Sequence, residues 1–122
     1  MYALLSATDR AHPAARATFE RLLSADETLL AHNYVLLETT ALLQRRLGLD
    51  AVGALRDALA PALSVVWIDR ELHAQALAAT LAAGDPTISL VDRVSFELMR
   101  RRRVSRAFAF DEHFAEQGFE LL

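Results

Sequence analysis

The chain has 122 residues, the length of one domain, and 53% of them are hydrophobic while 24% are charged. This balance excludes intrinsic disorder, and the absence of cysteine excludes a disulfide scaffold, a thiolate metal site and a cysteine nucleophile. No apolar run approaches the ~20 residues of a membrane span, and no basic segment precedes the first apolar stretch, so we expect a cytoplasmic protein without a membrane partner.

The net charge of −3 conceals an uneven distribution, because all thirteen basic residues are arginines. Coding bias explains the absence of lysine. Between positions 93 and 106, however, a single acid, Glu97, faces six arginines: Arg93, Arg100, Arg101, Arg102, Arg103 and Arg106. A patch of this charge can hold phosphate groups. A solvated helix face, or arginines that complement the dipole at a helix C-terminus, explains the same pattern.

The first half of the chain reads mainly as helices. We predict a short helix over residues 1–6, a helix over 14–23, a brief strand over 28–31, a long helix over 33–47 and another over 51–59. Asn33 is a suitable N-cap for the long helix, and Gly48 stands where a helix C-terminal glycine belongs. Pro61 ends the last of these helices.

The second half alternates strands and helices. We predict a strand over residues 64–68, a helix over 70–83 ended by Gly84, a helix capped by Ser89 and reaching Arg102, a strand over 107–110, a helix over 112–116 and a strand over 119–122. Strands separated by helices predict a single α/β domain over residues 1–122, with a mainly parallel sheet between helices. Ligands bind beyond the carboxyl ends of such strands.

Three acids lie where a solvated face would not put them. Glu38 and Asp92 share helix faces with apolar residues at spacings of three, four and seven, and Asp111 ends the predicted strand over 107–110. An unpaired buried carboxylate is unfavourable and is usually paired, protonated or bound to a metal. Three such acids at one sheet edge would form an oxygen site suited to Mg²⁺ or Mn²⁺, ions that promote phosphoryl displacement.

Each acid also has a purely structural explanation. Asp111 is a suitable N-cap for the helix that follows it. Glu38 is placed to pair with an arginine such as Arg45, and Asp92 in a first helical turn complements the helix dipole. The four histidines show no metal-ligand spacing and are interpreted as surface or capping residues. From the residues alone, the prediction is a small α/β domain with a candidate acidic metal site.

Four segments, in this order and spacing, resemble the PIN domain, and in particular the VapC-type toxins of bacterial toxin–antitoxin pairs. They are Tyr-Ala-Leu-Leu-Ser from position 2, followed by Asp9 and His12; Asn-Tyr-Val-Leu-Leu-Glu-Thr from 33; Ser-Leu-Val-Asp-Arg-Val-Ser-Phe from 89; and Ala-Phe-Asp-Glu-His-Phe from 109, followed by Gly118 and Phe119. The resemblance extends over nearly the whole chain and implies a three-layer sandwich.

The resemblance implies a ribonuclease that uses Mg²⁺ or Mn²⁺ to hydrolyse RNA phosphodiester bonds. Glu38, Asp92 and Asp111 match the family's catalytic, metal-binding acids, and Ser89 matches its supporting hydroxyl residue. RNA phosphates would then contact basic residues of the arginine-rich segment, namely Arg93, Arg100, Arg101, Arg102 and Arg103. The resemblance also implies a homodimer and a cognate antitoxin protein that covers the acidic groove with a basic group.

The family pattern opens with a strand ending in Asp-Thr-Ser, and this chain begins after that point. We therefore expect the middle strand of the sheet and one metal-binding aspartate to be absent from these residues, through either a truncated reading frame or a genuinely shortened member. The alternative function is a catalytically inactive PIN-fold protein that acts through antitoxin or dimer contacts. A helical interaction module whose acids form ion pairs is a third hypothesis.

Overall fold

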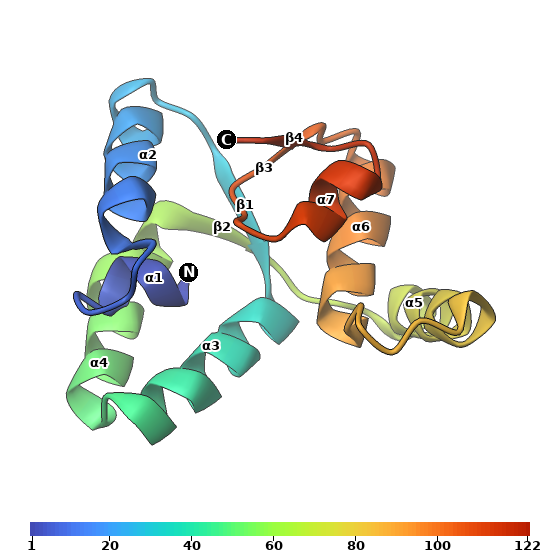
Figure 1. Cartoon of the computed structure of the whole chain (residues 1–122), viewed down its shortest axis with the longest axis horizontal. Helices are drawn as coiled ribbons and strands as arrows, with labels where there is room; N and C mark the ends of the chain where they lie inside the picture. The colour runs from blue at the N-terminus through green and yellow to red at the C-terminus, as the bar shows by residue number, and fades with distance from the viewer. The chain divides into compact units, whose positions relative to one another are not determined.

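The computed structural model describes all 122 residues, which form two compact units, Met1–Trp67 and Ile68–Leu122. The order of their elements can be followed in Figure 1. None of the helices combines the length and the apolar character needed to cross a membrane.

The first unit contains most of the helices and one pair of strands. Its elements are α1 (Tyr2–Leu5), α2 (His12–Ser24), β1 (Leu29–His32), α3 (Asn33–Arg46), α4 (Leu49–Ala54), a π-helical turn (Leu55–Leu59), a 3₁₀ turn (Ala60–Ala62) and β2 (Leu63–Val66). The two strands are parallel, with Leu29 opposite Leu63 and His32 opposite Val66. Because α3, α4 and the two turns connect them, the unit is a βαβ crossover preceded by two helices.

A leucine cluster forms the core of this unit. Leu43, Leu55 and Leu59 are buried, and residues of α1, α2 and α3 pack against them, including Leu5, Phe19 and Leu36. Leu43 comes from α3 and the other two leucines from the π-helical turn. The predicted helix over 51–59 is therefore only partly α-helical, and its second half is wound as a π-helix that ends before Pro61.

α3 begins with a histidine cap, which corrects one detail of the sequence analysis. The N-cap is His32 and not Asn33, because the His32 Nδ1 accepts a hydrogen bond from the Val35 amide at 3.3 Å. The His32 side chain is only 3% exposed, and its burial lowers the pKa to about 4. The prediction that histidines serve as capping residues is thus confirmed at this position.

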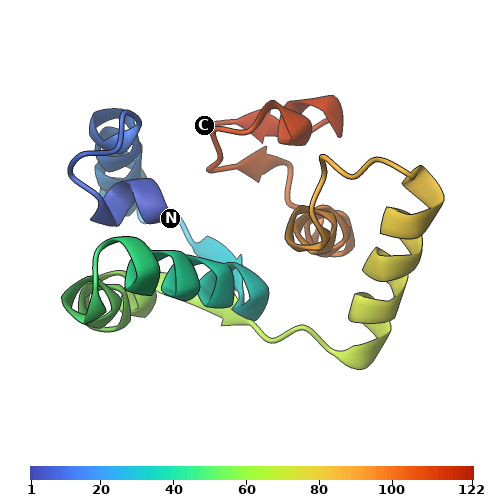
Figure 2. The same cartoon turned by 60° about the horizontal axis from the view of Figure 1, so that its bottom comes forward.

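The second unit is built around two longer helices. Its elements are α5 (Arg70–Ala83), α6 (Leu90–Arg102), β3 (Arg106–Ala107), α7 (Glu112–Glu116) and β4 (Glu120–Leu121). The bounds expected for α5, for α6 with its Ser89 cap and for α7 are confirmed. Figure 2 shows α5 and α6 joined by the loop that follows Gly84. The φ of Gly84 is 63°, in the left-handed region that favours glycine.

The strand predicted over 107–110 is shorter than expected. β3 contains only Arg106 and Ala107, which pair with Glu120 and Leu121 of β4 in parallel. Phe108 and Ala109 are half-buried and Phe110 is 52% exposed, so aromatic β propensity alone does not extend the strand without a longer backbone partner. The strands predicted over 64–68 and 119–122 are shortened in the same way.

Aromatic packing fixes the core of the second unit. Phe96 of α6 is 1% exposed, and its ring centroid lies 4.9 Å from that of Phe114 and 6.0 Å from that of Phe119. Ile88 and Met99 complete the buried cluster together with Ala107. This cluster ties α7 and β4 to the face of α6, and thereby sets the position of the residues that begin α7.

The strands form two separate two-stranded sheets, both parallel, with the orders β1–β2 and β3–β4. The prediction of parallel pairing is confirmed. Neither sheet has more than two strands.

α6 ends in a hydrogen-bonding pattern that usually requires glycine. The Val104 amide donates to the Met99 carbonyl at 2.9 Å, and the Arg103 amide donates to the Arg100 carbonyl at 3.2 Å. Arg103 itself takes a φ of 55°. This is the left-handed cap of a Schellman motif, formed here by an arginine.

Candidate metal centre

Asp92 and Asp111 are brought together by the starts of two helices. Asp92 is the third residue of α6, whose N-cap Ser89 accepts a hydrogen bond from the Asp92 amide at 3.1 Å. Asp111 is the N-cap of α7 and accepts a hydrogen bond from the His113 amide at 2.9 Å. The capping role considered for Asp111 in the sequence analysis is therefore real, and it coexists with membership of a cluster.

The cluster consists of Asp92, Asp111 and His113. Each of these side chains offers one ligand atom, and the three atoms lie within 4.8 Å of one another. Asp111 Oδ1 is 3.0 Å from His113 Nδ1. This contact is not a hydrogen bond, since the ring nitrogen and the carboxylate oxygen are poorly aligned. The buried Nδ1 therefore has no hydrogen-bond partner.

The electrostatics of Asp92 are those of a carboxylate that lacks a compensating charge. Burial raises the pKa of the Asp92 carboxyl above its usual value, and the neighbouring Asp111 raises it further; His113 and a hydrogen bond with Ser89 act in the opposite direction. A cation placed at the cluster would stabilise the ionised form, since an opposite charge nearby favours the carboxylate.

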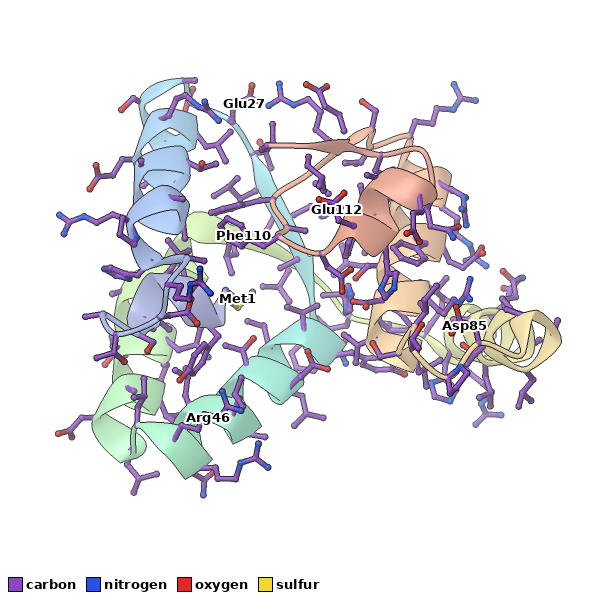
Figure 3. The ribbon with its side chains drawn as sticks, in the orientation of Figure 1. Met1, Glu27, Arg46, Asp85, Phe110 and Glu112 are labelled. Carbon is purple, nitrogen blue, oxygen red and sulfur yellow. The ribbon has the colours of Figure 1, made fainter.

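Asp85 lies close enough to His113 to be influenced by its charge, but it is occupied by its own loop. Its Oδ1 accepts hydrogen bonds from the Thr87 amide at 2.9 Å and the Thr87 hydroxyl at 2.6 Å. These bonds are the main reason that the pKa of Asp85 is lowered, with smaller contributions from His113 and Arg93. Asp85 is labelled in Figure 3, together with Glu112, the exposed acid that follows Asp111.

These residues fit a divalent cation. Two carboxylates supply the oxygen ligands that Mg²⁺ and Mn²⁺ prefer, and open positions remain for water and substrate. The buried His113 Nδ1 without a hydrogen-bond partner and the raised pKa of Asp92 are both relieved when a positive ion binds. Asp92 and Asp111 would therefore hold the ion.

Glu38 is exposed, whereas the sequence analysis expected it to be buried. It belongs to α3 of the first unit and its side chain is exposed. The buried residues of α3 are Thr39 and Leu43, with Leu36 packed against the leucine core, and this stripe of positions 36, 39 and 43 has the helical period. Glu38 lies about 100° around the helix from Thr39, so the apolar neighbours at three and four residues marked the wrong face.

The burial expected for the other two acids is also only partly observed. Asp92 is half-buried and Asp111 is exposed. An N-cap residue sits at the end of its helix with its carboxylate directed at backbone amides, so it keeps access to solvent. Exposure of this kind is compatible with a site that has to admit substrate.

Some side chains of the arginine-rich segment form polar contacts within the chain, and others are available for a ligand. Arg100 donates to Gln117 at 2.7 Å, lies 3.6 Å from Glu97 and covers the ring of Phe119, and Arg101 donates to Gln75 of α5. The exposed side chains of Arg102 and Arg103 form no ion pair or hydrogen bond within the chain. Arg93 is half-buried, and its Nε has no hydrogen-bond partner.

His113 is the cluster member that the sequence analysis did not select. The spacing of the histidines among themselves carries no signal here, because His113 joins two aspartates, one of them 21 positions earlier in the chain. The available signal was its place two residues after Asp111, in the first turn of a helix. A side chain there lies beside the N-cap carboxylate.

The sequence matches the PIN domain family over residues 2–120. It is 33% identical over 118 residues to the 23S rRNA-specific endonuclease VapC20 of two Mycobacterium tuberculosis strains, CDC 1551 / Oshkosh and H37Rv, and the match covers 96% of this chain and 88% of the relative. The crystal structure of M. tuberculosis VapC20, described as a sarcin-ricin loop cleaving toxin, is similar to this chain with a TM-score of 0.79, and the match covers 97% of this chain and 89% of VapC20.

These similarities confirm the resemblance to VapC-type PIN domains and the α/β fold expected from it. They also agree with the expectation of a nuclease, since the relatives are endonucleases that act on RNA.

Proposed function

This chain belongs to the PIN-domain family, and we propose that it is a divalent-metal-dependent endoribonuclease of the VapC toxin type, with residues 1–122 acting as one domain. The observation that carries the proposal is the cluster of Asp92, Asp111 and His113, built at the starts of α6 and α7 on a PIN fold. Glu38 is proposed as a further ligand because it matches the family's helix glutamate. Ser89 supports the site by capping α6 and holding Asp92.

The chemistry is hydrolysis of an RNA phosphodiester bond. When bound, Mg²⁺ or Mn²⁺ supplies an activated water and offsets the charge that builds on the phosphate. Asp92 and Asp111 hold the ion and fix its position relative to the RNA. Their own negative charge repels phosphate in the absence of metal, so substrate binding and metal binding are coupled.

Metal dependence is the first test of this function. We expect the purified chain to cleave 23S rRNA, the substrate named for its relative, in the presence of Mn²⁺ or Mg²⁺. Chelation with EDTA is expected to abolish cleavage, and added metal to restore it. The measurement is gel analysis of the RNA, with an isolated sarcin–ricin hairpin as a second substrate. Cleavage that persists in EDTA would contradict the proposal, and absence of cleavage with every ion would favour the non-catalytic alternative.

The arginine-rich segment is proposed to bind RNA phosphates. Arg102 and Arg103 lie ten and eleven residues beyond Asp92, and at about 1.5 Å per helical residue this places them roughly 15 Å along α6. An RNA strand cut at the cluster would therefore reach them a few nucleotides away. Arg93, Arg100 and Arg101 belong to the same proposal. Contacts of this kind position RNA without selecting its sequence.

Neutralising the two available arginines tests this contact. Arg102→Gln and Arg103→Gln are each expected to weaken RNA binding and to reduce the slope of log affinity against log salt concentration by about 1. The measurement is fluorescence anisotropy of a labelled RNA at several salt concentrations, in an Asp92→Asn background that slows cleavage. Arg56→Gln is the matched control, because Arg56 is exposed and already paired with Asp57. An unchanged salt slope in both variants would remove the segment from the RNA path.

The partners are proposed on the same family basis: a cognate antitoxin that presents a basic group to the carboxylates, and a second copy of the chain. Exposed leucines support a protein interface. Leu77 and Leu81 lie one turn apart on α5 and are 40% and 74% exposed. Light scattering of the purified chain checks the dimer. A cytoplasmic location completes the proposal, because an RNA substrate would be accessible there.

A further inference from the structure

His113 is the only member of the cluster that is not an acid. It is the second residue of α7, two positions after the N-cap of that helix. Asp111 caps α7 by accepting the His113 amide hydrogen. The same carboxylate oxygen, Oδ1, lies 3.0 Å from the His113 Nδ1, and the His113 side chain is 25% exposed. The cap therefore holds the backbone of His113, and the His113 Nδ1 atom lies beside the same carboxylate.

The His113 Nδ1 atom is buried and has no hydrogen-bond partner in the chain. A buried nitrogen without a partner is unfavourable, and such atoms in native proteins call for an explanation. The 3.0 Å contact with Asp111 Oδ1 is too poorly aligned to serve as a hydrogen bond. A cation bound by both atoms would supply the partner that the nitrogen lacks.

The spacing agrees with two neighbouring positions around one ion. In octahedral coordination with ligands about 2.1 Å from the metal, adjacent ligand atoms are separated by about 3.0 Å. The Asp111 Oδ1 and His113 Nδ1 atoms have this separation. One ligand atom from each of Asp92, Asp111 and His113 lies within 4.8 Å of the others, so Asp92 is a neighbour of the same candidate site.

We infer that His113 binds the catalytic cation directly through Nδ1, so that the centre has a mixed nitrogen and oxygen ligand set. This inference rests on the proposed function and goes beyond it, because it assigns a ligand that the acids alone do not provide. An imidazole ligand suits first-row transition metals better than Mg²⁺. His113 therefore shifts the preference of the site toward Mn²⁺.

Pulsed electron paramagnetic resonance of the Mn²⁺-loaded chain tests the contact without any activity measurement. The expected result is a ¹⁴N coupling of a directly bound imidazole in the native chain, which is lost in His113→Ala. His73→Ala is the matched control, since His73 lies on α5 of the same unit, and this variant is expected to keep the coupling. Bound Mn²⁺ without a nitrogen coupling in the native chain would overturn the inference.

Metal titration supplies a second readout. His113→Ala is expected to weaken Mn²⁺ binding about tenfold or more and to affect Mg²⁺ less, as followed by the metal-induced rise in the thermal unfolding midpoint. Equal losses for both ions, or no loss, would contradict the nitrogen ligand. The failure of the inference is distinguishable from that of the proposed function. If Asp92→Asn abolishes metal binding and cleavage while His113→Ala changes neither, the ribonuclease stands and His113 is no ligand.

Discussion

Asp92→Asn, Asp111→Asn and Glu38→Gln are each expected to lower the rate of RNA cleavage by roughly 10²–10³-fold, the effect typical of removing one group that stabilises transition-state charge. Each change replaces a carboxylate oxygen by an amide nitrogen of the same size. The fold should be preserved, because asparagine caps a helix as well as aspartate does, and Asp111 acts as the cap of α7. The measurement is the single-turnover rate at saturating Mn²⁺.

Two other changes from carboxylate to amide serve as controls. Glu112→Gln alters the exposed acid next to Asp111, and Asp50→Asn alters an exposed acid in the first turn of α4. Both are expected to cut RNA at the native rate. Full activity in any one of the three test variants would exclude that residue as a ligand. For Glu38 this outcome would mean that the residue matches the family's helix glutamate without binding the metal.

The second large effect is a loss of stability in mild acid that originates at His32. Its pKa is about 4 in the folded chain because burial disfavours the imidazolium, against about 6.5 in an unfolded chain. Between these values the unfolded state binds a proton that the folded state does not, so stability falls as the pH is lowered from about 6.5 to 4 and is level outside this window. The expected loss is on the order of 3 kcal/mol, since one pKa unit corresponds to about 1.4 kcal/mol.

Urea unfolding at pH 4, 5, 6 and 7.5, followed by circular dichroism, measures this dependence. His32→Asn is the informative variant, because asparagine can still accept the Val35 amide hydrogen and does not titrate. It is expected to be less stable than the native chain at pH 7.5 and to lose less stability on acidification. The difference between the two profiles isolates His32 from the other titrating groups. Parallel profiles would show that His32 is not the acid-sensitive group.

Local sequence signals predicted the helices of the second unit to the residue and the strands poorly. Ser89, Gly84 and Asp111 mark helix ends through contacts within a few residues, so their meaning does not depend on the rest of the fold. Strand length depends instead on a partner backbone. Phe108 and Phe110 have high β propensity, yet β4 offers β3 only two residues to pair with.

The candidate site was predicted in part for the same reason. Asp92 was indicated by its apolar helix face and Asp111 by its place at the end of a predicted strand, and the structure brings the two together. The apolar neighbours of Glu38 indicated a buried face, but the leucine core selects the stripe of Leu36, Thr39 and Leu43. His113 was missed because its ring position follows from the cap geometry of α7, which spacing between histidines does not encode.

The left-handed arginine at the end of α6 has an evolutionary consequence. A non-glycine residue in this conformation carries a penalty of about 1 kcal/mol or more, and Arg103 has a φ of 55°. A directed-evolution screen for heat resistance would therefore favour glycine at this position, and each such gain would remove one positive charge from the proposed RNA path. Heat resistance gained at position 103 would therefore be expected to come with weaker RNA binding.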